Sequence, residues 1–434
     1  MKQLTRLFIP ICLETLFYML SGMVDTLMLS AVGDYAVGAV GTANSYIGIF
    51  IIMFSIISSG MVSVMTQNIG AGRPGVAYQA RQLGLLFNAV AGVLMAVFLF
   101  SGAGAILRMV GIADALYEPA LIYLKIVGGG CILNAVIPIF SSYLRAFGYT
   151  KQPLYATIVG NIANFVMNAV FLFVLHTGAA GVAAATVISK ILNLCIVLYF
   201  SHKLISAKNS TERIANKTVL GQIVKVGLPS ACETALYNVA MMLVIRFLNQ
   251  MDAEGLNVTA RSYTATISNF SYCVGAALAQ ANAIMTGWHI GAGELEECDR
   301  GTKRAAFVGV CVAVCMETAI VLGSGFIMPL FTDNPEMTAL VRKLLAIDIV
   351  LEIGRVTNLV FGQALKTSGD AVFPAVIAAV FMFVFAVGGT WLFGISMGLM
   401  AVGAYIGLAS DECVRAVGMV WRWKTGKWRT KKLV

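Results

Sequence analysis

The stretch Ile9 to Tyr18 reads IPICLETLFY, and a related stretch at Leu228 to Tyr237 reads LPSACETALY. In both, a proline is followed by a glutamate after four positions, then directly by a threonine, and by a tyrosine after eight. The matched pairs, 219 positions apart, are Pro10 and Pro229, Glu14 and Glu233, Thr15 and Thr234, and Tyr18 and Tyr237. A carboxylate therefore recurs in the same frame within sequence that is otherwise apolar.

Two further stretches return in the same order, at an offset of 221 positions. QNIGAGRPGVAYQAR at 67–81 recurs as WHIGAGELEECDR at 288–300, and LRAFGYTKQP at 144–153 recurs as LKTSGDAVFP at 365–374. Three ordered matches at nearly one offset indicate an internal duplication. We expect lobes at 1–200 and 223–421, a polar linker at 201–222 and a basic tail at 422–434.

The composition is that of an integral membrane protein. Hydrophobic residues make up 59% of the 434 residues and charged residues only 12%, with a mean hydropathy of +0.84. A spanning helix needs about 20 apolar residues, and about twelve such segments follow one another. They are 7–30, 42–66, 84–107, 118–144, 153–175, 180–201, 223–248, 258–286, 304–330, 340–364, 372–395 and 399–421. The predicted fold is therefore all-α, with six helices in each lobe.

The loop charges predict the orientation. If the N-terminus is cytoplasmic, the only bases in outside loops are Arg108, Arg246, Arg342 and Lys343, which places both termini in the cytoplasm of a multi-pass plasma (inner) membrane protein. The net charge of +9 then reflects a basic inner face opposite anionic lipid, and no nucleic-acid partner is implied. Six spans per half is an even number, so we expect the lobes to be related by a pseudo-two-fold axis along the membrane normal, around a central cleft, as in secondary transporters.

The ensemble of motifs resembles the multidrug and toxic compound extrusion (MATE) family. It consists of P-x-x-x-E-T with a later D-T in the first span, QNIGAG after the second, YLRA-x-G around the fourth loop and NIANFVMN in the fifth span. The resemblance covers essentially the whole chain. It implies cation-driven export of amphipathic, often cationic, organic compounds by alternating access between two lobes.

Asp25 is the strongest candidate for ion coupling, because positions 21, 22, 28 and 29 offer no base on its own helix. An ionisable group inside a span is a functional candidate unless it is paired, and desolvation favours its protonated form. The resemblance implies four neighbours: Tyr123, Asn164, Asn168 and Thr186. Asn168 stands where the family commonly has aspartate, and one carboxylate fewer favours a proton over sodium as the coupling ion. Lys190 either pairs with Asp25 in one state or snorkels to the interface.

A second group of intramembrane charges has partners on its own helices. Glu352 precedes Arg355 by three positions, and Asp411 and Glu412 precede Arg415 by four and three. Asp348, one turn before Glu352, leaves this cluster with more acid than base. Structural ion pairs and a role in transport are equally compatible with this pattern.

Glu14 and Glu233 are expected near the cytoplasmic ends of spans one and seven. They could form an acidic rim that attracts cationic substrate or closes an inner gate when protonated. Alternatively they are helix N-terminal carboxylates stabilised by the helix dipole, an interpretation that Pro10 and Pro229 favour.

Other functions are weighed against export. A lipid-linked oligosaccharide flippase of the same superfamily is the alternative, supported by the intramembrane bases Lys125, Lys190, Arg261 and Arg355. No metalloprotease or nucleophile-elbow motif is present, so we expect no enzyme activity, no catalytic residue, no metal site and no cofactor besides a coupling proton or sodium ion.

The family's NorM branch has a glutamate where Tyr237 stands, and Asp370 matches its tenth-span aspartate only loosely, so the chain looks closer to the DinF-like branch. We expect a monomer surrounded by lipid.

Overall fold

The structure is a computed structural model and describes the chain except for residues 1, 31–32, 110–111, 207–211 and 253–254. The side chains at 34–35, 49–50, 52 and 55 are also left undescribed. Within these limits the secondary structure is helical, and no strand occurs in the described ranges. The all-α prediction is confirmed.

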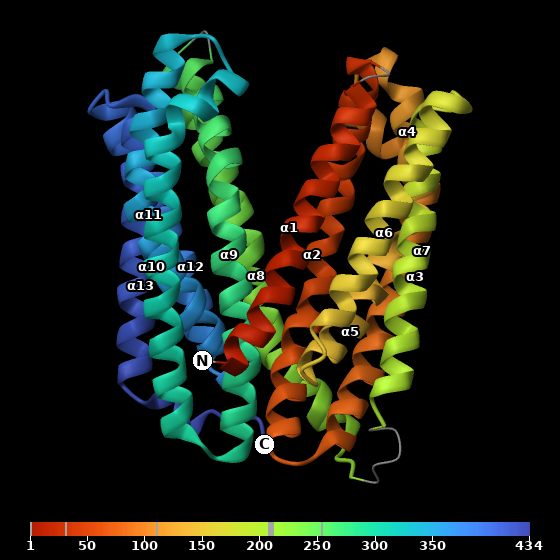
Figure 1. The fold of residues 1–434 in the computed structure, drawn as a ribbon, viewed down its shortest axis with the longest axis vertical. Coiled ribbons are helices and arrows are strands. Elements are labelled where there is room, and N and C mark those ends of the chain that lie inside the picture. Colours follow the sequence, from red (N-terminus) through yellow and green to blue (C-terminus); the bar gives the residue numbers. More distant parts are fainter. Residues whose placement is uncertain (1, 31–32, 110–111, 207–211, 253–254) are drawn as a thin grey trace. The chain divides into compact units, whose positions relative to one another are not determined.

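The first half contains seven α-helices and one π-helical segment (Figure 1). They are α1 (Lys2–Ser30), α2 (Asp34–Gly70), α3 (Pro74–Met109), α4 (Asp114–Gly129), α5 (Cys131–Ala146), α6 (Lys151–Ala169) with η1 (Val170–Val174), and α7 (Gly178–Leu204). The bend between α4 and α5 is 41°, and Gly130 lies between the two helices. Together they occupy the single span predicted at 118–144.

The second half repeats this order, except that one uninterrupted helix, α11, takes the place of α4 and α5. Its elements are α8 (Asn216–Met251), α9 (Leu256–Ala292), α10 (Leu295–Ile327) with η3 (Met328–Leu330), α11 (Pro335–Ser368), α12 (Val372–Phe381) with η4 (Met382–Val387) and η5 (Thr390–Ser396), α13 (Met400–Lys424) and η6 (Lys427–Thr430). The bounds of α3 and of α10 with η3 differ by 221 positions at both ends, the offset found in the sequence. The duplication therefore extends to the secondary structure.

The repeated glycine motif at 148 and 369 ends a helix in each half. Gly148 (φ 84°) and Gly369 (φ 98°) adopt the left-handed conformation that glycine accommodates without strain. The amide of Gly148 donates to Arg145 O and that of Gly369 to Lys366 O, at 2.9 and 3.0 Å. The next amide, at Tyr149 or Asp370, donates to Leu144 O or Leu365 O. Such C-caps satisfy the last carbonyls of the helix.

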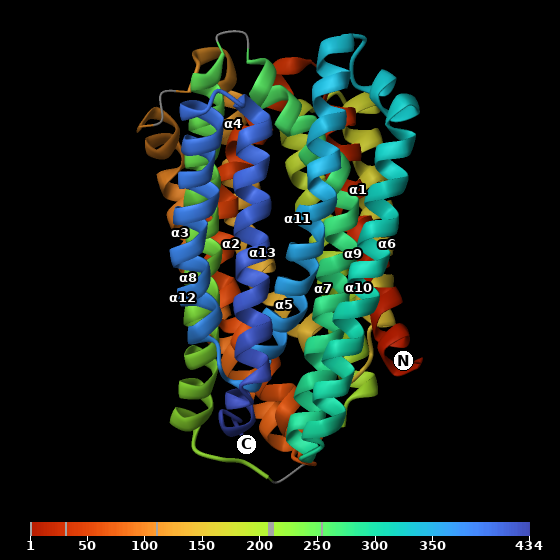
Figure 2. The ribbon, with the colours of Figure 1, turned by 90° about the vertical axis from the view of Figure 1, so that its left-hand side faces the viewer.

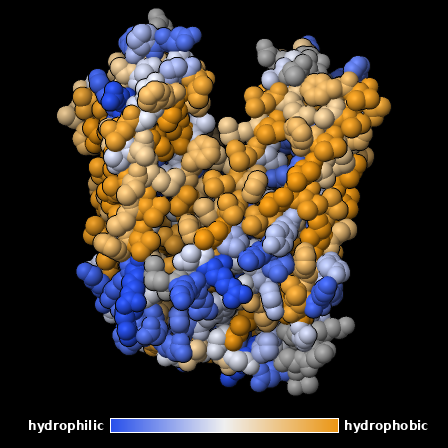
Figure 3. Space-filling model, viewed as in Figure 1, coloured by the Kyte–Doolittle hydropathy of each residue, from blue (hydrophilic) through white to orange (hydrophobic). Residues whose placement is uncertain are grey.

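Several helices are long and apolar enough to cross a membrane. Among the described residues, seven pass on length and composition, and the bent pair α4–α5 would be an eighth. The helix α3 exposes large apolar side chains along its length, among them Leu86, Leu94 and Val97, as expected of a surface in contact with lipid. Figure 3 shows apolar surface over much of the helices, and hydrophilic residues gathered where α9 ends and α10 begins. Helices also cover the other predicted spans, in α2, α9, α11 and α13.

The described chain divides into two compact units whose boundaries differ slightly from the two sequence halves. One unit comprises Ile9–Gly227, and the other comprises Met1–Phe8 together with Leu228–Val434. Each unit is a bundle of long helices (Figures 1 and 2). The start of α1 thus packs in the second unit, and the start of α8 packs in the first. The two boundaries are equivalent, because Gly227 follows Phe8 by the offset of 219 seen in the sequence. The pseudo-two-fold axis stays a prediction.

The start of α8 is fixed closely within the first unit. A Cβ added to Gly227 would lie 1.8 Å from the carbonyl oxygen of Ile56 on α2, so the two backbones touch. Before α8, the Gln79 side chain donates to Ile214 O at 2.7 Å and accepts from Ile214 N at 3.2 Å. This part of the linker is therefore attached to α3.

The predicted basic tail is folded against the second unit. Trp428 stacks on Trp423 with ring centroids 4.2 Å apart, and the Trp423 indole donates to Asp299 at 2.7 Å. Arg429 pairs with Glu296 at 2.6 Å. Trp428 is 1% exposed, so the tail contributes a core side chain as well as charge.

Candidate functional site

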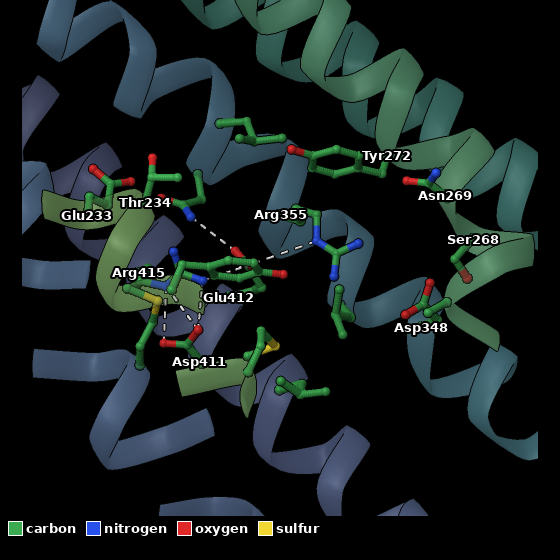
Figure 4. A pocket seen from close by; sticks show the side chains of 18 of the residues that line it. Glu233, Thr234, Ser268, Asn269, Tyr272, Asp348, Arg355, Asp411, Glu412 and Arg415 are labelled. Carbon is green, nitrogen blue, oxygen red and sulfur yellow. Dashed lines mark hydrogen bonds and ion pairs between the residues drawn. The ribbon is translucent and has the colours of Figure 1, made fainter. Parts of the chain in front are cut away.

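A pocket of about 470 Å³ lies within the second unit (Figure 4). Its walls come from α8, α9, α11, α13 and η4. Glu233 and Thr234 lie at one side of the view, and Asp348 with Ser268 at the other. Aromatic and apolar side chains such as Tyr272, Tyr405 and Met241 line it alongside the charged groups. The pocket is of a size and mixed character suited to a small organic molecule.

The charged groups of the pocket form an ion-pair network. Arg415 contacts Asp411 at 2.7 Å and Glu412 at 2.8 Å. Arg355 contacts Glu352, and its Nε lies 3.7 Å from Glu412, which also accepts from the Asn358 amide at 3.0 Å. The pairs of Arg355 with Glu352 and of Arg415 with Asp411 and Glu412 are those that the helical spacing predicts. The contact of Glu412 with Arg355 on the other helix is additional. Glu412 joins them into one network, which spacing along a single helix does not reveal.

Asp348 and Arg261 line the same pocket with fewer contacts. One carboxyl oxygen of Asp348 is buried and has no hydrogen-bond partner in the described chain. Arg261 contacts the sulfur of Met241 at 3.7 Å, and no carboxylate in the described ranges pairs with it. Asp348 and Arg261 therefore bring a carboxyl oxygen and a guanidinium nitrogen with spare hydrogen-bonding capacity to the pocket.

The Asp25 site lies in the first unit. Asn168 donates to Asp25 Oδ1 at 2.8 Å and to Asn164 Oδ1 at 3.2 Å. Tyr123 lies beside Asp25 and Thr186, and its hydroxyl donates to Asn44 at 3.3 Å. All five residues implied by the family resemblance are brought together, and Asn44 is a further member that sequence reasoning missed.

Asp25 has no ion pair within the described residues, in contrast to the acids of the pocket network. Lys190 is near enough for an electrostatic interaction but donates its hydrogen bond to Asn134, at 2.8 Å. The carboxyl group is thus oriented by the neutral amide of Asn168. It can lose or gain a proton without breaking an ion pair.

Both repeated glutamates are paired with a base. Arg145 lies 2.6 Å from Glu14, and Lys366 lies 2.8 Å from Glu233. No hydrogen bond joins either glutamate to the tyrosine four positions on, within the described chain; Tyr18 is 72% exposed. The bases follow the repeated leucines 144 and 365, so the ion pair itself is duplicated. The proposed acidic rim is therefore neutralised in this structure. The alternative of helix N-terminal carboxylates is wrong, because α1 begins at Lys2 and α8 at Asn216, well before either glutamate.

Asp370 also has a structural partner. Arg422 contacts it at 2.7 and 3.1 Å through two nitrogens, which attaches the end of α13 to the loop after α11. In the described ranges, no group of three or more His, Cys, Asp or Glu residues is arranged to hold a metal ion.

One buried acid was missed in the sequence. Glu317 on α10 is completely buried, and neither of its carboxyl oxygens has a hydrogen-bond partner in the described chain. The criterion applied to Asp25 would have found it, because positions 313, 314, 320 and 321 are Ala, Val, Ile and Val.

Comparisons with known proteins agree with this architecture. The profile of the MatE family matches residues 10–170 and 229–392, once in each half. The chain is 32% identical over 428 residues to the uncharacterized transporter YisQ of Bacillus subtilis, covering 97% of this chain and 94% of that protein. It is 20% identical over 446 residues to the probable multidrug resistance protein NorM of Thermotoga maritima, covering 100% and 94%. A solved structure described as the outward-facing conformation of a multidrug resistance MATE family transporter of the MOP superfamily superposes with a TM-score of 0.85 at 20% identity, covering 98% and 96%.

Proposed function

Since the chain belongs to the MatE family of multidrug and toxic compound transporters, we propose that it is a cation-coupled exporter of amphipathic organic compounds that prefers protons to sodium. The members of this family are transporters, not enzymes. The proposal includes alternating access between the two lobes, a monomeric protein in the plasma membrane with both termini cytoplasmic, and small organic substrates that are often cationic.

The observation that carries the proton preference is the environment of Asp25. The Asn168 amide donates to Asp25, and its neighbour Tyr123 is neutral. Lys190 is close enough for an electrostatic interaction but gives its hydrogen bond to Asn134. Sodium prefers several oxygen ligands, with carboxylates among the best, and here one carboxylate is present. A carboxyl group without an ion pair can exchange a proton as the site opens to each side in turn.

Gradient-driven transport in proteoliposomes tests the proposal. Purified protein should expel a cationic dye when a proton gradient is imposed, and respond weakly to a sodium gradient of equal size. Liposomes carrying Asp25→Asn are the matched control and should show only leak. Equal transport by the wild type and Asp25→Asn under a proton gradient would contradict coupling at Asp25.

A flippase for lipid-linked anionic cargo is the second candidate, and Arg261 is the observation that favours it. This guanidinium lines the pocket, and no carboxylate among the described residues pairs with it. The other pocket bases, Arg355, Arg415 and Lys366, are already neutralised by acids. Offering a lipid-linked oligosaccharide to the same liposomes separates the two functions, because an exporter of cations should leave it in its original leaflet.

A further inference from the structure

Glu317 is a carboxyl group for which the ion-pair network holds no base. It lies on α10 with 0% exposure, and both carboxyl oxygens are buried without a partner in the part of the chain that the structure describes. An ionised carboxylate in such a place loses its hydration and receives nothing in exchange. Burial without a partner therefore favours the neutral, protonated acid.

The helices packed against α10 bring further acids toward Glu317. From α11 come Asp348 and Glu352, both close enough to interact electrostatically, with Arg355 as the nearest base. From α9 comes the Ser271 hydroxyl, which lies beside Glu317 and is itself buried without a partner of hydrogen-bond geometry. Like charges this close disfavour simultaneous ionisation.

The bases of the network are already engaged. Arg355 contacts Glu352 and Glu412, and Arg415 contacts Asp411 and Glu412. Adding the unpaired Arg261 still leaves three bases for the five acids Glu317, Asp348, Glu352, Asp411 and Glu412. At least two acids must be protonated, or neutralised by a bound cation, if the network is to be electrically neutral. Glu317 is the most buried of those with no contact to a base.

We propose that Glu317 is a second proton-binding site of the transporter, filled and emptied through Asp348. Asp348 lines the pocket with an unpartnered oxygen and interacts electrostatically with Glu317, which does not itself line the pocket. The transfer breaks the O–H bond of a protonated Asp348 and forms one on the ionised Glu317; the reverse step returns the proton toward the pocket. A cationic group in the pocket would favour the ionised form of Asp348 and so promote release.

The site is independent of Asp25 and is not duplicated. The position equivalent to Glu317 in the first half is Ala96, which packs against the apolar core of the first unit. Asp25 lies in the first unit, whereas Glu317 lies in the second. Each unit then has one proton-binding acid: Asp25 is required for driven export, and Glu317 adds a second proton to each cycle.

Infrared difference spectroscopy of the purified full-length protein tests the protonated state without measuring transport. The wild type at neutral pH should show the C=O stretch of a protonated carboxylic acid, shifted in heavy water, and Glu317→Gln should lack this band. Glu336→Gln, which removes an exposed glutamate, is the matched control and should keep it. Gln is a neutral isostere of the protonated acid, so the variant should fold with wild-type stability. Persistence of every protonated-carboxyl band in Glu317→Gln would overturn the proposal.

A second variant covers the case in which Glu317→Gln fails to fold. Asp348→Asn removes the neighbouring acid and should shift the frequency of the Glu317 band; an unchanged band would overturn the assignment. Sodium titration distinguishes a proton site from a cation site. If sodium converts the protonated band to carboxylate bands at constant pH, the site binds a metal ion and the proposal fails.

The coupling role, which rests on the proposed export function, is measured as protons moved per substrate in proteoliposomes. Glu317→Gln should halve the ratio of the wild type. An unchanged ratio would refute the role of Glu317 in coupling. Wild-type liposomes that show no gradient-driven transport would instead refute the export function and leave the infrared result standing.

Discussion

The Glu14 carboxylate lies 2.6 Å from the guanidinium of Arg145, and the same ion pair recurs in the other half of the chain as Glu233 and Lys366, at 2.8 Å. Each pair joins the first helix of its half to the end of the fourth span of that half. These helices are α1 and α5 in the first half, and α8 and α11 in the second. The four side chains are 12–20% exposed, so the pairs are largely shielded from water. Duplication has thus kept a contact between distant parts of the sequence.

Breaking one of these pairs should weaken its unit. Glu14→Gln leaves Arg145 without its carboxylate, and we expect a loss of about 1–2 kcal/mol, less than for a fully buried pair because some water remains. Thermal unfolding in detergent measures the loss. Glu233→Gln should give a similar loss, and the double variant the sum, because the pairs lie in different units.

The same double variant tests whether the two glutamates form structural ion pairs or an acidic rim that attracts cationic substrate. A rim that guides cations predicts weaker export of cationic compounds alone, since the substitution removes charge but keeps shape. Equal loss for cationic and neutral compounds would favour a structural or gating role.

Replacement of Asp25 should separate binding from coupling. Asp25→Asn keeps an oxygen that can accept from Asn168, so we expect normal insertion and substrate binding within about tenfold of the wild type. Export against a gradient should be lost. Asn168→Asp should make transport more sensitive to sodium, because two carboxylates hold a hard cation better than one. Wild-type export by Asp25→Asn would move coupling to the second unit.

The aromatic stack of the tail should stabilise the second unit. Trp428→Ala removes a side chain that is 1% exposed and stacked on Trp423, and we expect a loss of about 3–5 kcal/mol. Arg429→Ala, which breaks a solvent-exposed ion pair with Glu296, is the control and should cost under about 1 kcal/mol. Thermal unfolding and limited proteolysis of the tail check both. Equal stability of the two variants would show that the tail does not contribute to the core.

Two glycines on α8 should respond in opposite ways to alanine. Gly227→Ala places a methyl group 1.8 Å from Ile56 O, so the helices must separate, at a cost of about 1–3 kcal/mol or more. Gly221 has no heavy atom within 4 Å of an added Cβ, and Gly221→Ala should gain about 0.5–1 kcal/mol of helix stability. A thermal shift of the same sign for both variants would contradict the close contact with α2.

Sequence reasoning succeeded where interactions are local or periodic. Apolar runs located the helices, and spacing along one helix located the pairs of Arg355 with Glu352 and Arg415 with Asp411. It missed the pair of Glu14 and Arg145, which are 131 positions apart, because no local pattern encodes that contact. The break at Gly130 was missed for another reason. The equivalent position in the other half, Leu351, lies within the uninterrupted helix α11, so the internal repeat gives no sign of a break.

The assignment of the helix starts to opposite units has a consequence for how the protein can be divided. Residues 1–8 belong with Leu228–Val434, and the start of α8 belongs with Ile9–Gly227, so the two halves exchange terminal segments much as subunits do in a domain-swapped dimer. A chain cut within the linker would yield two fragments, each holding a piece of the other's core. Neither fragment should fold by itself, whereas the two expressed together could reconstitute the transporter.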